Sequence, residues 1–344
     1  MILSRMPWRA HGGPDADGVP RWDFSTNANA CGPCPHAWMQ VQAAARGHYP
    51  DPAYTVLRQQ LADWHGVTPS RVLLAASGSE WILRFAAWCA RRGLGPLWWP
   101  QPGYGDYAHA AHVWGLARAA APGQARAGWL CDPGSPQGQP EDGAAATALL
   151  SAGAQVTLDL AYAPLRLEGG AVLDDAQRAR CWQLHSPNKA LGLTGVRGAY
   201  VIAPEDAEPS LLAELQALAP SWPIGADGVA LLAGWVEPAT QRWLQASRAT
   251  LAQWKAALVQ TLEARGWAVA PSVTPFVCAR PPRPLDAAAL RGHSIKLRDA
   301  TSFGLPGWWR LSAQPPQALQ ALAQALDVHA VVTAPRIAWW RASR

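Results

Sequence analysis

Lysine is scarce in this chain of 344 residues. Only Lys189, Lys255 and Lys296 occur, and arginine supplies the rest of the basic charge. Arginine stays protonated near neutral pH, whereas a lysine shielded from water can lose its proton and form a Schiff base with a carbonyl compound. A lysine that such a chain keeps between apolar and glycine-rich flanks is therefore a candidate for amine chemistry.

Long apolar runs are absent as well. No stretch reaches the roughly 18 uninterrupted apolar residues that a membrane-spanning helix needs. The first eight residues lack the apolar run of a secretory signal. We therefore expect a cytoplasmic protein with no membrane partner.

Charged residues are few, at 15%, while hydrophobic residues make up 49%. This balance is ordinary for a compact enzyme and too apolar for a disordered protein. The formal charge is +5, but the basic residues are scattered, so no nucleic-acid partner is expected. A chain of this length can bury a large core and is expected to fold as two domains.

Of the six cysteines, the four at 89, 131, 181 and 278 are spaced neither for zinc nor for a disulfide framework, and we expect no metal site. Cys31-Gly32-Pro33-Cys34 looks like a thioredoxin-type redox pair. However, the pair does not follow a buried apolar strand, and Pro35 and His36 are expected to interrupt any immediate helix. We interpret the pair as a loop feature, and a redox protein remains a distant alternative that requires a reducible disulfide.

Short apolar runs alternate with amphipathic stretches through the middle of the chain. The expected strands cover residues 71–76, 96–100, 129–131, 155–159, 181–185 and 199–202. The expected helices include residues 51–64, 77–89 and a segment that begins near residue 104. This alternation is typical of an α/β fold with a mostly parallel sheet and helices on both faces.

The pattern changes after residue 225. Residues 226–265 are alanine-rich and periodic, which predicts one or two long helices. Further strands are expected near residues 268–269, 276–279, 295–298 and 308–311, before a closing helix near 316–326. We predict an N-terminal arm of residues 1–35, a large domain of residues 36–225 and a smaller α+β domain of residues 226–344.

Three features at the expected strand ends suit a planar ligand that carries an anion. Ser77-Gly78-Ser79, at a strand-to-helix junction, offers N–H groups and hydroxyls to an anion. Tyr104 follows the next strand, where its ring would stack on a heterocycle. Asp159 ends a strand, and a carboxylate there points into the site region of such folds and would keep a pyridine nitrogen protonated. Each feature alone is more often structural, so the prediction depends on their combination.

Lys189 and Arg197 complete this combination. They lie eight residues apart in a glycine-rich segment, which suits a Schiff-base lysine and a phosphate-binding guanidinium. An anion cradle, a stacking tyrosine, a strand-end aspartate, an amine and an arginine are the parts that a pyridoxal 5'-phosphate site needs. They also occur in the required chain order, so we predict pyridoxal 5'-phosphate as the cofactor.

The order and spacing resemble the fold-type I pyridoxal-phosphate enzymes of the aspartate aminotransferase superfamily. The resemblance spans nearly the whole chain and is strongest to threonine-phosphate decarboxylases of cobalamin biosynthesis and to histidinol-phosphate aminotransferases. The segments that carry it, besides the lysine segment, are residues 11–13, 22–29, 48–52, 130–138 and 297–311. It implies a large domain with a mostly parallel sheet of the seven-stranded type, flanked by helices, and a smaller α+β C-terminal domain.

The resemblance assigns roles toward the cofactor. Lys189 would carry it as a Schiff base and later move protons. Tyr104 would stack on the ring, Asp159 would pair with the ring nitrogen, and Tyr162 would bond the ring hydroxyl. The phosphate would be held by Ser77, Gly78, Ser79, Ser186 and Arg197.

The resemblance also implies partners. Tyr49 would reach the cofactor phosphate of a second subunit, which implies a homodimer. The other partner would be a small phosphorylated amino-acid substrate. Its carboxylate and phosphate would be received by His11, Asn29, Arg298 and Arg310.

Three positions depart from the family pattern. Ser135 stands where the family has an asparagine that contacts the ring oxygen, so this bond would lengthen, pass through water, or fall to Tyr162 alone. A lost neutral hydrogen bond costs about 1 kcal/mol, so the cofactor is still expected to bind. Leu160 replaces the usual glutamate and Gln137 the usual threonine.

The leading functional prediction is decarboxylation of threonine phosphate to aminopropanol phosphate, because residues 11–13 and 23–27 resemble the decarboxylase N-terminus. The alternative is an aminotransferase of the histidinol-phosphate type that acts on a small phosphorylated amino compound. A third possibility, motivated by the three departures, is a degraded paralogue that keeps the fold for binding or assembly.

Overall fold

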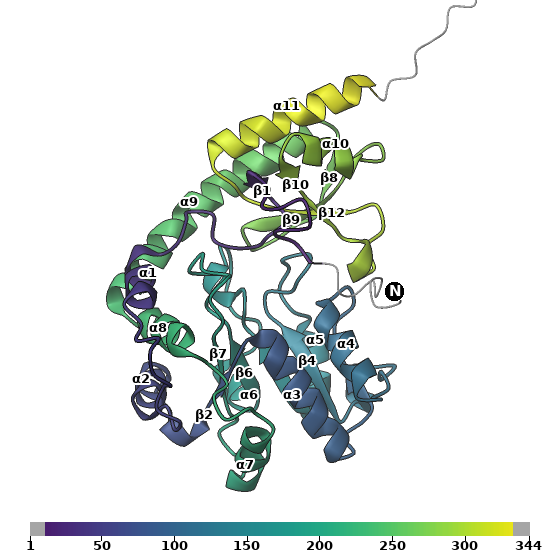
Figure 1. The fold of residues 1–344 in the computed structure, drawn as a ribbon. Helices are drawn as coiled ribbons and strands as arrows, with labels where there is room; N and C mark the ends of the chain where they lie inside the picture. The colour runs from purple at the N-terminus through teal and green to yellow at the C-terminus, as the bar shows by residue number, and fades with distance from the viewer. Residues whose placement is uncertain (1–10, 333–344) are drawn as a thin grey trace, which may run out of the picture.

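The centre of the protein is a six-stranded sheet, seen in a computed structural model that describes residues 11–332 (Figure 1). Its strands are ordered β2-β7-β6-β5-β4-β3. Their bounds are β2 Val72–Ala75, β3 Leu97–Trp98, β4 Ala127–Cys131, β5 Gln155–Asp159, β6 Trp182–His185 and β7 Ala199–Ile202. Neighbouring strands from β3 to β6 are parallel, whereas β7 is antiparallel to both β2 and β6. The predicted α/β fold with a mostly parallel sheet is confirmed.

The seventh strand of the expected sheet would lie next to β3, at the edge of the six-stranded sheet. Beyond β3, the described residues contribute only a single parallel bridge between Leu97 and Arg118. Leu97 donates to the Ala117 carbonyl at 2.9 Å and accepts from the Ala119 amide at 2.7 Å. The seventh strand is therefore reduced to one bridge.

Helices cover both faces of this sheet (Figure 1). On one face, α3 (Gly78–Arg91), α4 (Gly105–Val113) and α7 (Pro209–Ala217) share a buried aromatic cluster with β4 and β6. On the other face, α5 (Gly143–Ser151) packs against β4 and β5, while α1 (Pro35–Gln42), α2 (Thr55–His65) and α8 (Ala226–Trp235) pack against β2 and β7. The short α6 (Asp175–Ala179) precedes β6.

The C-terminal part contains an antiparallel sheet with the order β11-β12-β9-β8. Its strands are β8 Ala268–Val269, β9 Phe276–Arg280, β11 Arg298–Asp299 and β12 Trp309–Ser312. A separate parallel pair joins β1 (Trp22–Asp23) to β10 (Ile295–Lys296). The helices of this part are α9 (Pro238–Glu263), α10 (Ala287–Gly292) and α11 (Pro316–Val332).

The predicted division into an arm and two domains remains a prediction, although the packing bears on its boundaries. The β1–β10 pair attaches the arm to the C-terminal part. Leu231, Leu232 and Trp235 of α8 pack in the same cluster as α1 and α2, although α8 begins at the predicted start of the small domain.

The structure corrects one local prediction. A helix follows the Cys31–Cys34 segment at once, because Pro35 is the first residue of α1. Proline is well tolerated there, since the first helical N–H has no intrahelical partner and the fixed φ suits a helix. Within residues 11–332, no helix is long and apolar enough to cross a membrane. The cytoplasmic location remains a prediction.

Candidate active site

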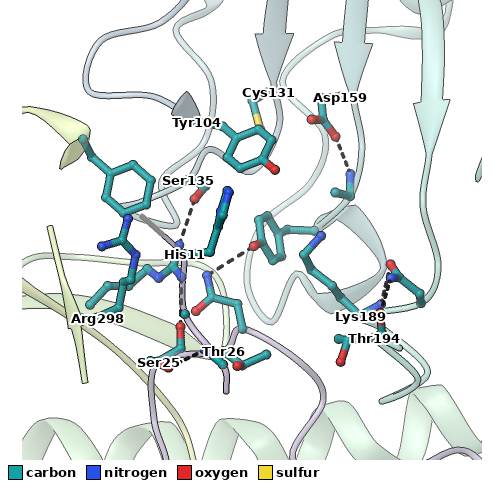
Figure 2. Close-up of a pocket in the computed structure, with 18 of the residues that line it drawn as sticks. His11, Ser25, Thr26, Tyr104, Cys131, Ser135, Asp159, Lys189, Thr194 and Arg298 are labelled. Atoms are coloured by element: carbon teal, nitrogen blue, oxygen red, sulfur yellow. Dashed lines mark hydrogen bonds between the residues drawn. The ribbon is translucent and has the colours of Figure 1, made fainter. Parts of the chain in front are cut away.

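A cavity of about 300 Å³ opens at the carboxyl ends of the central strands (Figure 2). The parallel register pairs Cys131, the last residue of β4, with Asp159, the last residue of β5, and both line the cavity. Lys189 reaches it from the loop that follows β6. The sequence predicted this meeting point, because the carboxyl ends of parallel strands share one edge of a sheet.

A smaller cavity of about 80 Å³ adjoins the first and shares Tyr104, Asp159, Lys189 and Arg197 with it. Its other lining residues include the predicted phosphate ligands Ser77, Gly78, Ser79 and Ser186. The N-terminus of α3 forms one wall of this cavity. Ser77 caps that helix by accepting a hydrogen bond from the Glu80 amide at 3.1 Å. Free amides and the helix dipole at this end favour an anion.

Asp159 is buried beneath the cavity and accepts two hydrogen bonds. The Tyr107 hydroxyl donates to Oδ2 at 2.8 Å, and the Ala161 amide donates to Oδ1 at 3.0 Å. Burial raises the pKa of Asp159 above its usual value, and these two donors together with the Lys189 charge oppose that rise. A cation placed against this carboxylate would favour its charged form.

The Lys189 side chain extends into the cavity (Figure 2). Its amine lies 5.5 Å from the centre of the Tyr162 ring. Lys255 pairs with Glu168 at 3.1 Å and Lys296 pairs with Asp15 at 2.7 Å. Among the described residues, Lys189 is the lysine that has no carboxylate partner. Its amine is thus available for chemistry.

Two arginines enter the cavity from the C-terminal sheet. Arg298 of β11 and Arg310 of β12 are direct cross-strand partners and are only 5% and 7% exposed. Burial lowers the pKa of both, and the Arg310 charge helps to lower that of Arg298 to about 10. The Phe303 ring lies 4.7 Å from the Arg298 guanidinium and 5.4 Å from that of Arg310. Two adjacent buried guanidiniums favour an anionic ligand.

Ser135 lines the same cavity, and its hydroxyl accepts a hydrogen bond from Arg310 at 3.2 Å. Arg310 also donates to the Ser25 carbonyl at 3.0 Å. The serine at this departure from the family pattern therefore helps to orient an anion-binding side chain. The Tyr162 hydroxyl also lines the cavity and accepts from Asn27 at 3.3 Å.

The structure differs from the sequence prediction at Asn29. This residue lies outside the cavity lining, because its amide group donates to the Ala190 carbonyl at 3.0 Å and to the Ser247 hydroxyl at 2.8 Å. Asn29 thereby braces the loop that carries Lys189. Asn27 lines the cavity instead, and its buried Oδ1 has no hydrogen-bond partner among the described residues. Asn27 and Asn29 lie two residues apart in a segment with no helix or strand, so the sequence alone could not show which of them lines the cavity.

Other predicted site residues fall in two groups. His11 lines the cavity together with Gly12 and Gly13. Tyr49 is 78% exposed and lies outside the cavity lining, stacked on Trp222 with ring centres 4.5 Å apart. Within residues 11–332, Tyr49 therefore does not reach the cavity of its own chain.

Sequence reasoning missed Tyr107, Phe303 and Thr194. Tyr107 lies three residues after Tyr104, one helical turn away, and this spacing could have indicated a shared face of α4. Phe303 belongs to a short turn whose position depends on the fold of the C-terminal part. Thr194 lines the cavity within the predicted lysine segment, but nothing in its spacing distinguished it.

These residues fit pyridoxal 5'-phosphate. The helix N-terminus and Arg197 suit its phosphate, and within residues 11–332 Arg197 forms no salt bridge. Asp159 is a buried carboxylate that a protonated ring nitrogen would balance. Lys189 offers an amine without a carboxylate partner among the described residues, and the buried Asn27 Oδ1 can accept a hydrogen bond from a ligand.

The sequence matches the family model described as aminotransferase class I and II over residues 129–326, which span Asp159, Lys189 and both cavity arginines. The chain belongs to this family. The protein is accordingly a pyridoxal-phosphate enzyme of fold type I, as the sequence motifs predicted.

Individual relatives of this aminotransferase-family protein agree with its fold. A curated relative, histidinol-phosphate aminotransferase 2 of Burkholderia mallei, is 28% identical over 306 residues, which cover 82% of this chain and 84% of the relative. The solved histidinol-phosphate aminotransferase of Sinorhizobium meliloti, in complex with pyridoxal-5'-phosphate, is 20% identical with a TM-score of 0.73 and 90% coverage of both chains. The L-threonine-O-3-phosphate decarboxylase of Porphyromonas gingivalis is 21% identical with a TM-score of 0.73, covering 90% of this chain and 99% of that one.

The presence of both Lys189 and Asp159 in one cavity argues against the non-enzymatic alternative. The redox alternative also meets a physical obstacle, because Cys34 is fully buried and burial raises the pKa of Cys31. A thioredoxin-type pair needs the opposite, a thiol whose pKa is lowered. Both cysteines are free thiols in the structure.

Proposed function

We propose that this protein is a pyridoxal-phosphate-dependent aminotransferase of the histidinol-phosphate type that acts on a small phosphorylated amino compound. The observation that carries the proposal is the composition of one cavity. An unpaired lysine amine and a buried aspartate share it with two adjacent buried guanidiniums, Arg298 and Arg310. Such guanidiniums suit the phosphate of one substrate and the carboxylates of an amino-group acceptor.

The bound cofactor supplies an electron sink for a negative charge at the substrate α-carbon. The chain supplies the rest. Asp159 would hold a proton on the ring nitrogen by hydrogen bonding and charge, and the Lys189 amine would move a proton at the substrate carbon. Tyr104 would restrain the ring, and the buried arginines would orient the substrate so that its α-proton faces the amine.

The names of the curated relatives support the aminotransferase reaction over decarboxylation. Histidinol-phosphate aminotransferases of Burkholderia and Pseudomonas species align over more than four fifths of this chain at 25–28% identity. This supports a phosphorylated amino compound as the amino donor class. It leaves the particular donor to experiment.

The test is amino transfer with purified, cofactor-loaded protein. Histidinol phosphate and threonine phosphate are each offered as amino donor with 2-oxoglutarate as acceptor, and glutamate and carbon dioxide are both measured. Glutamate formed from either donor without carbon dioxide supports the proposal. Carbon dioxide release from threonine phosphate without glutamate would replace it with the decarboxylase.

The decarboxylase remains the second candidate because of His11. This histidine lines the cavity with Arg298 and Arg310, so an imidazole and two guanidiniums face one substrate site. A substrate with both a carboxylate and a phosphate, such as threonine phosphate, would use all three. The product would then be aminopropanol phosphate, a precursor in cobalamin biosynthesis as the sequence resemblance implies.

We also propose a homodimer in which Tyr49 reaches the cofactor phosphate of the other subunit. Its 78% exposure and its stacking on Trp222 support a role outside its own cavity. Tyr49→Phe is expected to weaken cofactor binding by about tenfold, because a phosphate would lose one charge-assisted hydrogen bond. Sedimentation should give twice the mass of one chain, and a monomer at assay concentration would refute this arrangement.

A further inference from the structure

The segment of residues 11–18 is attached to the C-terminal part by a compact set of charges. The Lys296 amine donates to the Gly13 carbonyl at 2.6 Å and lies 2.7 Å from the Asp15 carboxylate. Arg291 donates to the other oxygen of Asp15 and to the Gly18 carbonyl, both at 2.9 Å. Asp15 thus lies between two cations, and their hydrogen bonds hold its pKa well below the usual range. We call this set the Asp15 clamp: Asp15, Arg291 and Lys296.

The clamped segment forms a wall of the substrate cavity. His11, Gly12 and Gly13 line that cavity. A side chain at Gly12 would place its Cβ 2.1 Å from the Ser25 carbonyl oxygen, so the two backbones are in direct contact. The Gly13 amide donates to the Ser25 hydroxyl at 2.8 Å, and the Ser25 carbonyl accepts from Arg310. The wall and the buried arginine therefore share Ser25 as a common support.

We propose that Lys296 is a positioning residue that sets the affinity of the site for its anionic substrate by holding this wall against Ser25. The inference rests on the proposed function for the identity of that substrate. Lys296 does not line the cavity, so it acts through Gly13 and Asp15. Its side chain is only 17% exposed, which limits screening of the ion pair by water and salt.

Loss of the Lys296 side chain should leave the fold intact. The strand β10 is held by its backbone pairing with β1, and the Phe24 amide donates to the Lys296 carbonyl at 2.9 Å. The neighbour Ile295 is buried in the C-terminal core. None of these contacts uses the Lys296 amine, so a variant can separate positioning from folding.

The kinetic test compares Lys296→Met with Lys296→Arg and with the control Arg265→Met. Arg265 forms a similar ion pair with Asp327, and neither residue lines the cavity. Lys296→Met is expected to raise KM for the phosphorylated donor by about tenfold with kcat changed less than about twofold, the size expected for one charged hydrogen bond. Lys296→Arg should recover most of the affinity, and Arg265→Met should leave KM unchanged.

Two further measurements do not depend on turnover. Hydrogen exchange of the Gly13 amide should quicken in Lys296→Met and stay slow in Arg265→Met. Calorimetric titration of the cofactor-loaded protein with inorganic phosphate should show weaker binding in Lys296→Met alone. If the wild type turns over neither donor, the proposed function fails while these two measurements still report on the clamp.

The proposal is overturned if Lys296→Met leaves Gly13 exchange unchanged. It is equally overturned if exchange quickens while KM and phosphate affinity both keep their wild-type values, since the clamp would then be structural only. A KM increase of the same size in Arg265→Met would also reject it, because the effect would not be local.

Discussion

The Tyr107 hydroxyl supports the carboxylate on which the cofactor site depends. It is one of two neutral donors to Asp159, at 2.8 Å, and burial already raises the pKa of that carboxyl. Removing the donor in Tyr107→Phe should raise this pKa further and weaken the charge that faces the ring nitrogen. We expect cofactor affinity to fall by about 10- to 100-fold, measured by titration of the apoprotein with pyridoxal 5'-phosphate.

The matched control for this prediction is Tyr200→Phe. Tyr200 is also fully buried and accepts a hydrogen bond from Trp235 at 3.2 Å, but it lies outside the cavity lining. Its loss should lower stability without changing cofactor affinity. Equal cofactor affinity in wild type and Tyr107→Phe would contradict the role given to Tyr107.

Asn27 and Asn29 should separate binding from stability. Asn29→Ala removes three side-chain hydrogen bonds, two donated to Ala190 and Ser247 and one accepted from the Cys31 amide, and should cost about 3 kcal/mol of unfolding free energy. Asn27→Ala removes an amide whose Oδ1 has no partner within residues 11–332, so it should cost less stability and mainly raise KM. Denaturant unfolding and steady-state kinetics of both variants test this. A larger KM increase in Asn29→Ala than in Asn27→Ala would support the sequence-based prediction that Asn29 binds the substrate.

At the scale of single elements, most of the fold could be predicted because its signals are local. The strand of residues 155–159 agrees with β5, and Ser77 marks the start of α3 as predicted. Lys189 and Arg197 were found by spacing within one segment. By contrast, β1 has only two residues, and its partner β10 lies far away in the sequence, so no local pattern predicts β1. Residues 11–29 depend on that long-range pairing, which is why the choice between Asn27 and Asn29 could not be made in advance.

The loop that carries Ser135 ends in a contact that only glycine allows. Gly138 has a φ of +70°, and a Cβ there would lie 2.2 Å from Thr274 Oγ1 and 2.3 Å from Ser272 Oγ. The Gly138 carbonyl also accepts from the Val273 amide at 2.8 Å, which joins the cofactor loop to the C-terminal part. Gly138→Ala should therefore lower the unfolding free energy by roughly 2–4 kcal/mol and weaken cofactor binding.

Gly153→Ala is the control for backbone strain alone. Gly153 has a similar φ of +68°, but an added Cβ meets nothing within 4 Å. Gly153→Ala should lower the unfolding free energy by about 1 kcal/mol, the ordinary penalty of a left-handed conformation for a residue with a side chain. Similar losses in the two variants, measured by denaturant unfolding, would mean that the close contact at Gly138 contributes nothing.

For the whole molecule, two partly buried groups should give the stability opposite dependences on pH. Burial lowers the pKa of His65 to about 4, and the nearby Arg178 charge contributes to this decrease. The His65 Nε2 atom forms a hydrogen bond with the Tyr200 hydroxyl at 2.9 Å. Burial raises the pKa of Glu141 to about 7, although the Cys131 and Asp142 amides donate to its carboxylate. Between about pH 5 and 6 the folded protein therefore keeps His65 neutral and Glu141 protonated.

The sign of each effect follows from which state binds more protons. Near pH 5 the unfolded chain protonates His65 and the folded protein does not, so stability from His65 falls as pH drops from 6.5 toward 4. The folded protein protonates Glu141 and the unfolded chain does not, so stability from Glu141 falls as pH rises from 4.5 toward 7. Each contribution changes by up to about 3 kcal/mol across its window.

Difference curves isolate the two groups, because each variant removes one titration and leaves the rest. Relative to His65→Gln, the wild type should lose stability as pH falls from 6.5 to about 4. Relative to Glu141→Gln, the wild type should lose stability as pH rises from 4.5 to about 7. Urea unfolding at closely spaced pH values measures both differences, and a flat curve for His65→Gln or Glu141→Gln would mean that the group titrates alike in the folded and unfolded chains.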